Sequence, residues 1–173
     1  MIRDGSWNRP VSPSPLPEQR RGGRGRGLPP EPERELIAVA TDARTRAYVP
    51  YSHYAVGAAI LTADGRIHGG CNIENASYGL TSCAERNAIF ALVGTSSDPD
   101  ARRIRAVAGV TAGDDPATPC GACRQVIREF GKDAAIVIAN TDGKVFLRTT
   151  LDALLPHSFG PEQLESPNDN AEH

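Results

Sequence analysis

The stretch "IRAVAGVTAGDDPATPCGACRQVIREFGKDAAIVIAN", residues 104–140, holds the pattern that decides the fold. Its two ends, "IRAVAGVT" and "AAIVIAN", are β-type runs, and the segment Cys120–Phe130 between them is helical and closes at Gly131. Two parallel neighbouring strands must be joined by a crossover, which is usually a helix. The stretch therefore predicts a parallel pair of strands that is bridged by a helix.

Two β-hairpins are predicted on either side of this unit. The runs "HYAVGAAILT" (residues 53–62) and "RIHGGCNI" (residues 66–73) flank Asp64-Gly65, a dipeptide that supplies the positive φ of a tight turn. Downstream, Asp142-Gly143 turns the strand "AAIVIAN" into the run "KVFLRT". Each pair of runs is expected to form antiparallel neighbours.

Three further helices are predicted at Glu33–Val49, Ser82–Val93 and Thr150–Leu155. In the first, apolar residues recur at helical spacing until Pro50 ends the pattern. Helices that alternate with strands, together with two hairpins, indicate an α/β fold. We expect a three-layer α/β/α sandwich around a mixed five-stranded sheet.

The chain of 173 residues has the length of one globular domain. Residues 1–32 are dense in Pro, Gly, Ser and Arg, and they hold too few aliphatic side chains to offset the entropy of an ordered chain. We expect them to form a disordered leader, residues 33–164 to form the domain, and residues 165–173 to form a disordered tail. The "RRGGRGRG" of the leader is either a solvated segment or a contact for a polyanion.

Composition excludes several classes of function. No apolar run approaches the roughly 20 residues of a membrane span, and no secretory signal is present, so we expect a cytoplasmic protein without a membrane partner. The net charge is −2, and residues 1–34 hold seven arginines against four acidic residues, which leaves residues 35–173 acidic. Because nucleic-acid-binding surfaces are normally basic, this domain is not expected to bind nucleic acid.

Three of the four cysteines lie in "SCAERNAI" and "PCGACRQ". Cys83 and Cys120 fall in the first turn of two predicted helices, and Cys123 follows Cys120 by three residues on nearly the same helix face. Helix starts favour thiolates, and zinc prefers thiolate ligands. Three protein ligands leave a fourth position for water, which zinc makes acidic enough to supply hydroxide at neutral pH. A redox pair is the other interpretation of the C-x-x-C motif, but it needs no distant third cysteine.

Glu85 has two interpretations. Ser82-x-x-Glu85 fits a capping box, in which the glutamate caps the start of the helix. A carboxylate two residues after a zinc ligand also lies where it can take a proton from the bound water and deliver it to a substrate. The three nearby thiols favour the second interpretation.

C-A-E followed by P-C-x-x-C is the signature of the zinc-dependent deaminases, and the chain is identified by this resemblance as a member of that superfamily. Cysteine as the first ligand, "GCNIENASYG", "CAER", "PCGACRQVIREF" and "LLPHSFGPEQL" are similar to the small homotetrameric cytidine deaminases of pyrimidine salvage. The resemblance spans residues 33–164. It implies a free nucleoside as substrate, one Zn²⁺ per chain, a homotetramer, and hydrolysis of cytidine or 2'-deoxycytidine to uridine or deoxyuridine.

The resemblance also implies a role for each residue of the reaction centre. Cys83, Cys120 and Cys123 would hold zinc, and hydroxide formed there would attack C4 of cytosine. Glu85 would move the proton of the water to ring N3 and then to the departing ammonia. Arg86 resembles the arginine that hydrogen-bonds the ligand sulfurs and offsets the charge of three thiolates; an exposed helix arginine is the plainer interpretation.

Substrate contacts are implied in the same way. Asn72 and Glu74 match an N-x-E pair that holds the ribose 3'-hydroxyl, and alternate positions of a strand would place both on one side. The remaining matches are the backbone N–H of Ala84 for the base carbonyl, the carbonyl of Thr118 for the amino group, Tyr54 beside the nucleoside, and Tyr78 and Phe159 reaching into the pocket of a neighbouring subunit. Tyr54 replaces a phenylalanine common in relatives, and Cys71 is expected to be a small buried residue.

Three other functions remain to be weighed. A deaminase of blasticidin-type antibiotics generally lacks the N-x-E pair and the arginine after C-A-E, and both are present here. A deaminase of tRNA or single-stranded DNA usually has histidine as first ligand and a longer crossover between its last strands than Asn140–Gly143 allows. A structural zinc module or an RNA adaptor would have no use for Glu85.

Overall fold

The computed structural model describes residues 28–115 and 117–164. These residues form a five-stranded sheet in the order β2-β1-β3-β4-β5, in which β3 and β4 are parallel and the other neighbours are antiparallel. The strands are β1 (Gly57–Thr62), β2 (Ile67–Cys71), β3 (Ile104–Thr111), β4 (Ala135–Asn140) and β5 (Val145–Thr150). The predicted mixed sheet is confirmed, including the parallel pair on either side of the crossover helix.

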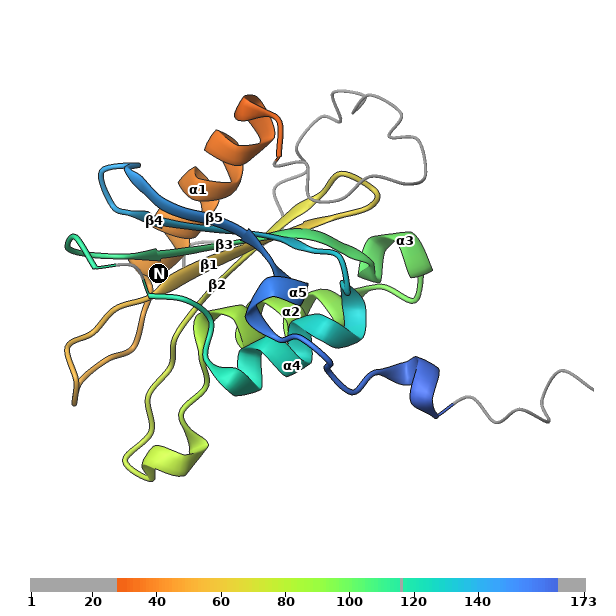
Figure 1. The fold of residues 1–173 in the computed structure, drawn as a ribbon. Coiled ribbons are helices and arrows are strands. Elements are labelled where there is room, and N and C mark those ends of the chain that lie inside the picture. The colour runs from red at the N-terminus through yellow and green to blue at the C-terminus, as the bar shows by residue number, and fades with distance from the viewer. Residues whose placement is uncertain (1–27, 116, 165–173) are drawn as a thin grey trace, which may run out of the picture.

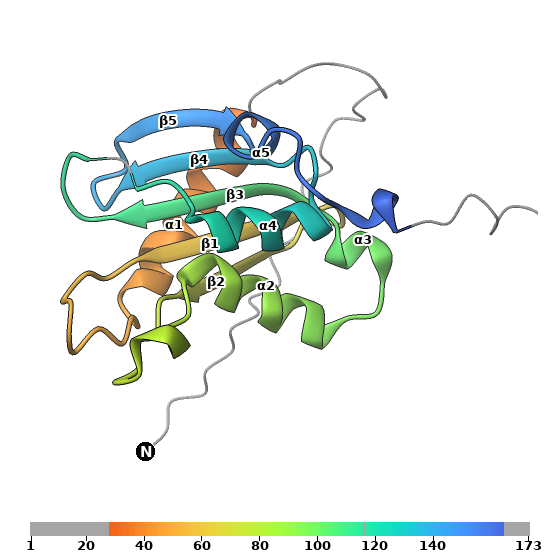
Figure 2. The ribbon, with the colours of Figure 1, turned by 60° about the horizontal axis from the view of Figure 1, so that its bottom comes forward.

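Helices cover both faces of this sheet, as the predicted α/β/α sandwich requires. Figure 1 shows α1 on one face and α2, α4 and α5 on the other, and Figure 2 shows α2 and α4 next to each other on their face. The bounds are α1 (Pro30–Arg44), α2 (Ala84–Thr95), α3 (Pro99–Arg102), α4 (Gly121–Phe130) and α5 (Leu151–Leu154), with 3-10 helices η1 (Tyr78–Leu80) and η2 (Pro161–Gln163).

The central strands are buried on both sides, so the core consists of two clusters. On one side Leu36 and Ala40 of α1 pack with Leu61 of β1 and its neighbours. On the other side Ile60 packs with Ile89 of α2 and with side chains of α4. Successive residues of a strand point to opposite faces, which is why β1 is buried throughout and β3 is buried at every position except Arg105.

The first helix ends at Arg44, so the prediction that it continues to Val49 is wrong. The N–H groups of Thr45 and Arg46 bond to carbonyls three residues back, and this tighter turn closes the helix. Tyr48 then forms a parallel bridge with Ile73, in which its N–H donates to the carbonyl of Asn72 over 3.1 Å. Pairing with the segment after β2 therefore overrides helical periodicity in this segment.

The start of α2 lies directly on β2. A Cβ at Gly70 would come within 2.6 Å of the carbonyl oxygen of Ala84 and the backbone nitrogen of Ala88, so only glycine permits this approach. The side-chain amide of Asn87 donates to the carbonyl of Cys71 over 2.8 Å and fixes the helix along the strand. The first turn of α2, which carries the C-A-E motif, is thereby held at the end of β2.

Local signals account for the remaining short elements. Both predicted hairpin turns form, with φ of +87° at Gly65 and +80° at Gly143. The short helix α3 was not predicted, although Pro99 stands at its first position and Asp98 accepts the N–H of Asp100 as its cap. Helix α1 also begins earlier than predicted, at Pro30, because proline is well suited to a first helical position.

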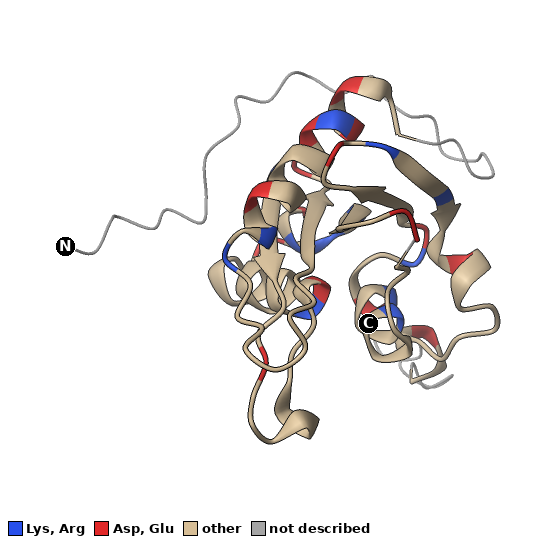
Figure 3. Ribbon diagram, turned by 90° about the vertical axis from the view of Figure 1, so that its left-hand side faces the viewer, with Lys and Arg blue, Asp and Glu red and all other residues tan. Residues whose placement is uncertain are grey.

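The expected leader and tail fall largely on residues 1–27 and 165–173, which lie outside the described residues. The start of α1 carries acidic residues with one basic residue among them (Figure 3), since Glu33, Arg34 and Glu35 are consecutive. Within residues 28–115 and 117–164, none of the helices combines the length and apolarity that a bilayer span needs.

Candidate active site

Three thiols from two helices converge at one end of the sheet. Cys83 and Cys120 are the N-cap residues of α2 and α4, one position before the first turn in which they were predicted, and Cys123 lies in the first turn of α4. The sulfur of Cys120 is 3.8 Å from that of Cys83 and 3.5 Å from that of Cys123. All three sulfurs lie within 4.8 Å of one another.

This spacing fits a zinc ion. Zinc bonds thiolate sulfur at about 2.3 Å, so tetrahedral geometry places two ligand sulfurs about 3.8 Å apart. The three sulfurs need only small shifts to reach it. Cys123 is buried while Cys120 is exposed, so the cluster has a protein side and an open side. Three ligands with an open side are the arrangement of catalytic rather than structural zinc sites.

The local charges favour a thiolate at Cys83. The neighbouring Cys123 thiol, first, and then the guanidinium of Arg86 together lower the pKa of Cys83 to about 5. The pKa of Cys123 is raised by the Cys83 thiolate beside it and by burial, so this thiol keeps its proton and donates it to Glu85. Binding of a metal would displace that proton, so zinc affinity is expected to fall as the pH is lowered.

Glu85 contacts this cluster and does not form a capping box. The N-cap of α2 is Cys83, which receives no side-chain capping bond, and Glu85 is therefore the second helical residue rather than the third. Its side chain is 5% exposed, and its Oε2 atom accepts from the thiol of Cys123 over 3.4 Å. Burial raises the pKa of the Glu85 carboxyl, as is common for carboxyls that exchange protons in catalysis.

Arg86 contacts one of the three thiols, that of Cys83. Its Nη2 is 3.5 Å from the sulfur of Cys83 and donates to the carbonyl of Thr81 over 3.2 Å. The plainer interpretation, an exposed helix arginine, is wrong because the residue is half-buried and contacts the cluster. A fixed cation at this position favours thiolate over thiol.

Asn72 and Glu74 lie on the same side, but not in a regular strand. Strand β2 ends at Cys71, so its predicted continuation to Ile73 is wrong, and Ile73 instead forms isolated bridges to Tyr48 and Ser82. The chain stays extended through these bridges. The side chains of Asn72 and Glu74 consequently both turn toward the loop of residues 51–56.

Both side chains bind the backbone of that loop. The Oδ1 of Asn72 accepts the N–H of Val56 over 2.8 Å, and its amide donates to the carbonyl of Tyr54 over 2.9 Å. The Oε2 of Glu74 accepts the N–H groups of Tyr51 and Ser52 over 3.0 and 3.2 Å. Hydrogen bonds from Ser52, from its hydroxyl first, lower the pKa of Glu74, so this carboxylate stays ionised at neutral pH.

The aromatic residues of the predicted site are all exposed on the chain. Tyr54 is 50% exposed, Tyr78 70% and Phe159 57%. The ring of Tyr78 contacts that of Tyr51 with centroids 5.7 Å apart. Tyr51 was not singled out from the sequence, although it lies three residues before Tyr54 and also binds Glu74.

A second residue missed by the sequence is Arg124, which follows Cys123 directly. Its Nε donates to the carbonyl of Pro119 over 2.7 Å, and its Nη2 donates to the hydroxyl of Thr118 over 3.0 Å. These bonds hold the turn that precedes Cys120 and orient Thr118.

Ala84, fully buried, begins α2, where backbone N–H groups lack partners within the helix.

Comparison with known proteins agrees with this geometry. Residues 30–139 match the family model of the cytidine and deoxycytidylate deaminase zinc-binding region. The chain is 46% identical over 131 residues to cytidine deaminase of Sporosarcina psychrophila, covering 75% of this chain and 93% of the relative. A crystal structure of cytidine deaminase from Burkholderia pseudomallei superposes with a TM-score of 0.65 at 46% identity, covering 72% of this chain and 97% of that one.

A more distant match is blasticidin-S deaminase of Bacillus cereus, which is 32% identical over 139 residues and covers 72% of this chain and 90% of the relative. The matched region of the family model includes all three thiols and Glu85, and the thiol spacing fits the metal for which that region is named. Zinc is therefore the cofactor of this cluster. The chain belongs to the cytidine and deoxycytidylate deaminase family.

Proposed function

We propose that this protein is a cytidine deaminase, which hydrolyses cytidine and 2'-deoxycytidine to uridine and deoxyuridine with release of ammonia. The observation that carries the proposal is the contact between the buried Glu85 carboxyl and the three-thiol cluster. A structural zinc site has no use for a buried acid beside its ligands. Identity of 46% to a cytidine deaminase supports the choice of substrate.

Cys83, Cys120 and Cys123 would hold the zinc, which when bound supplies a water acidic enough to react at neutral pH. Glu85 would accept a proton from such a water at Oε2, and the oxygen would add to C4 of the cytosine ring. The carboxyl would then deliver this proton to ring N3 and carry the proton of the new C4 hydroxyl to the amino group, which leaves as ammonia while the oxygen stays on C4 as a carbonyl. Arg86, 3.5 Å from Cys83, offsets part of the negative charge of the thiolates.

The loop of residues 51–56 forms the sugar side of this proposed site. Because Asn72 is already bonded to the backbone at both ends of its amide group, its first role is to set the shape of the loop. Glu74 remains ionised and accepts the ribose 3'-hydroxyl, while Tyr54 packs beside the nucleoside. At the base, the N–H of Ala84 meets the ring carbonyl and the carbonyl of Thr118 receives the amino group.

Two further aromatic side chains of the proposed site would come from a neighbouring copy. We propose a homotetramer in which Tyr78 and Phe159 enter the pocket of the adjacent subunit. Large apolar side chains exposed together support an interface, and one such group consists of Tyr48, Tyr51, Ile73, Tyr78 and Leu80. Phe159 is also exposed, beside Gln125 of α4. The reaction would serve pyrimidine salvage in the cytoplasm.

One assay tests the proposed function. Purified protein should convert cytidine to uridine, and the loss of ultraviolet absorbance measures this conversion. A chelator that removes the zinc should abolish the conversion until zinc is returned. Turnover that persists in zinc-free protein would contradict the metal assignment. Turnover of blasticidin S but not of cytidine or deoxycytidine would contradict the substrate.

Replacement of Glu74 by Ala tests the sugar contact. Hydrogen bonds to charged groups contribute roughly 1.5 to 3 kcal/mol, so kcat/KM for cytidine should fall by about ten- to a hundredfold. The loss should be absent with 3'-deoxycytidine, which lacks the hydroxyl. An equal loss with both substrates would show that Glu74 acts by holding the loop through Tyr51 and Ser52 instead.

A further inference from the structure

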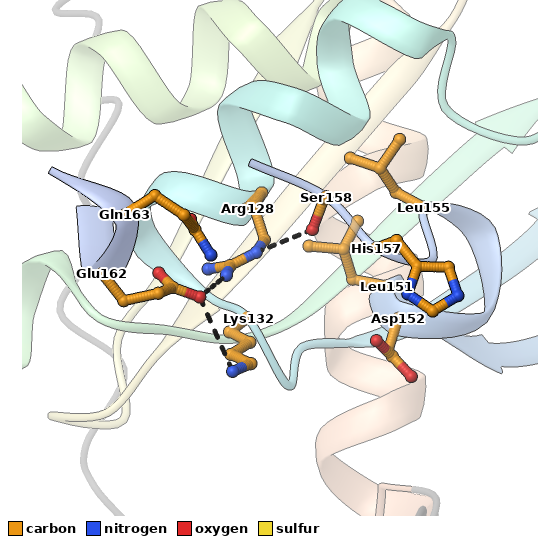
Figure 4. A pocket seen from close by; sticks show the side chains of 9 residues that line it. All are labelled: Arg128, Lys132, Leu151, Asp152, Leu155, His157, Ser158, Glu162 and Gln163. Carbon is orange, nitrogen blue, oxygen red and sulfur yellow. Dashed lines mark hydrogen bonds and ion pairs between the residues drawn. The ribbon is translucent and has the colours of Figure 1, made fainter. Parts of the chain in front are cut away.

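The segment of residues 158–163 wraps around one buried side chain, Arg128, from the last turn of α4. The guanidinium Nε donates to the hydroxyl of Ser158 over 2.8 Å, and Nη2 donates to the carboxylate of Glu162. Arg128 is 6% exposed, whereas Glu162 and Lys132, which also contacts this carboxylate, lie at the surface. Figure 4 shows the two bonds leaving the guanidinium toward different parts of the segment, beside the pocket that these residues line.

Gly160 allows the segment to close on Arg128. A Cβ at this position would lie 2.6 Å from Arg128 Nη2, 2.7 Å from its Cζ and 2.6 Å from Oε2 of Glu162. The backbone of Gly160 is extended, with φ of −152°, so the requirement is for space and not for an unusual conformation. The guanidinium is therefore enclosed by three alternate residues of the segment: Ser158, Gly160 and Glu162.

The same helix also holds the backbone inside this segment, at Phe159, and before it, at Leu154. The side-chain amide of Gln125 donates to the carbonyl of Phe159 over 3.0 Å, and Arg124 Nη1 donates to the carbonyl of Leu154 over 2.9 Å. Helix α4 begins with the ligands Cys120 and Cys123. The position of Phe159 is thus fixed relative to the helix that carries two of the three thiols.

We propose that Arg128 is a positioning residue for Phe159. By holding the segment around Phe159, it fixes the direction in which this ring projects from the surface, and this direction determines how well the ring completes the site of a second copy. The inference rests on the proposed function, in which Phe159 enters a neighbouring pocket. Arginine suits the task because its planar fork binds two acceptors in fixed directions, whereas lysine offers a point charge. Ser158 and Glu162 flank Phe159, so loss of the fork frees the ring without removing it.

Kinetics of two variants test the inference. Arg128→Gln removes the fork, and Gly160→Ala displaces it by steric contact while leaving every charge in place. Both should raise KM for cytidine by about tenfold and change kcat by less than about twofold, because the ring binds substrate and transition state alike. Zinc content and tetramer mass should remain those of the wild type. If Arg128→Gln does not fold, Gly160→Ala provides the same test.

Arg148→Gln is the matched control. Arg148 also forms a two-bond ion pair, with Glu33 of α1, but on the opposite face of the sheet from α4. Its loss removes an arginine–carboxylate pair of the same kind without affecting the segment around Phe159. KM should stay at the wild-type value.

Phe159→Ala separates the inference from the function on which it rests. Phe159→Ala should raise KM by itself, and adding Arg128→Gln should then cause no further increase, because the ring that Arg128 positions is gone. An Arg128→Gln effect that persists in the Phe159→Ala background, or a normal KM in Arg128→Gln and Gly160→Ala, would overturn the inference alone. A normal KM in Phe159→Ala would overturn the shared pocket and the inference with it.

Discussion

Replacement of Glu85 by Gln should lower kcat for cytidine by about 10²- to 10⁴-fold while zinc stays at one per chain. Glutamine keeps the size of the side chain and its capacity to accept a hydrogen bond, but it cannot carry a proton, and proton transfer by a positioned group contributes a factor of this order. Steady-state turnover, read with metal analysis on the same sample, measures both quantities.

Stability distinguishes a catalytic loss from a folding defect. The Glu85 carboxyl is buried, and burial raises its pKa, so a neutral amide at this position should not destabilise the protein. Glu33→Gln is the matched control, since it makes the same chemical change in a carboxylate of α1 that pairs with Arg148. It should retain normal kcat. Near wild-type turnover in Glu85→Gln would return Glu85 to a structural role.

The register of one helix decides between the two interpretations of Glu85. In the sequence, Ser82 and Glu85 have the spacing of a capping box, and that spacing works only if Ser82 is the N-cap. The structure places the N-cap at Cys83, and Arg86 becomes the third helical residue. A shift of one residue thus turns the carboxyl from the helix end to the thiols, and single-residue boundaries are the least certain part of a sequence pattern.

The fold was predictable where local signals and sheet pairing agree. The order of the strands and of helices α1, α2, α4 and α5, both hairpin turns and the crossover at α4 follow from apolar runs and turn residues close together in the chain. The end of α1 was not predictable in this way, because it depends on a bridge between Tyr48 and Ile73, which are far apart in sequence. An isolated bridge of one residue pair is too short to leave a periodic pattern in either partner.

The same distinction applies to the site. The thiols were predictable because two ligands lie three residues apart and the third lies beside another predicted helix start. The use of Asn72 as a support for the loop was not predictable, because its partners Tyr54 and Val56 are ordinary backbone groups. Arg128 was also missed, because an arginine in a helix is usually interpreted as a solvent-exposed charge. Only the structure shows its contacts with Ser158 and Glu162.

Cys120→Ala should abolish zinc binding and, with it, deamination. Loss of a residue beside a metal ligand typically costs 10- to 100-fold in affinity, so loss of a ligand should weaken zinc binding by more than about 100-fold. Cys120 is exposed, so its replacement leaves no cavity, whereas Cys123→Ala adds a packing loss at a fully buried position. Metal analysis after dialysis, together with thermal unfolding, measures the two effects separately.

Cys71→Ala completes this comparison, because Cys71 is a buried cysteine outside the thiol cluster. It should retain one zinc per chain and full activity, and lose only the small stability of a buried sulfur. If zinc binding depends on three thiolates, both Cys120→Ala and Cys123→Ala lose the metal, and only Cys123→Ala also loses packing. Full zinc retention with normal turnover in Cys120→Ala would show that the metal is held by another set of ligands, and the assignment of an open, catalytic position beside Glu85 would fall with it.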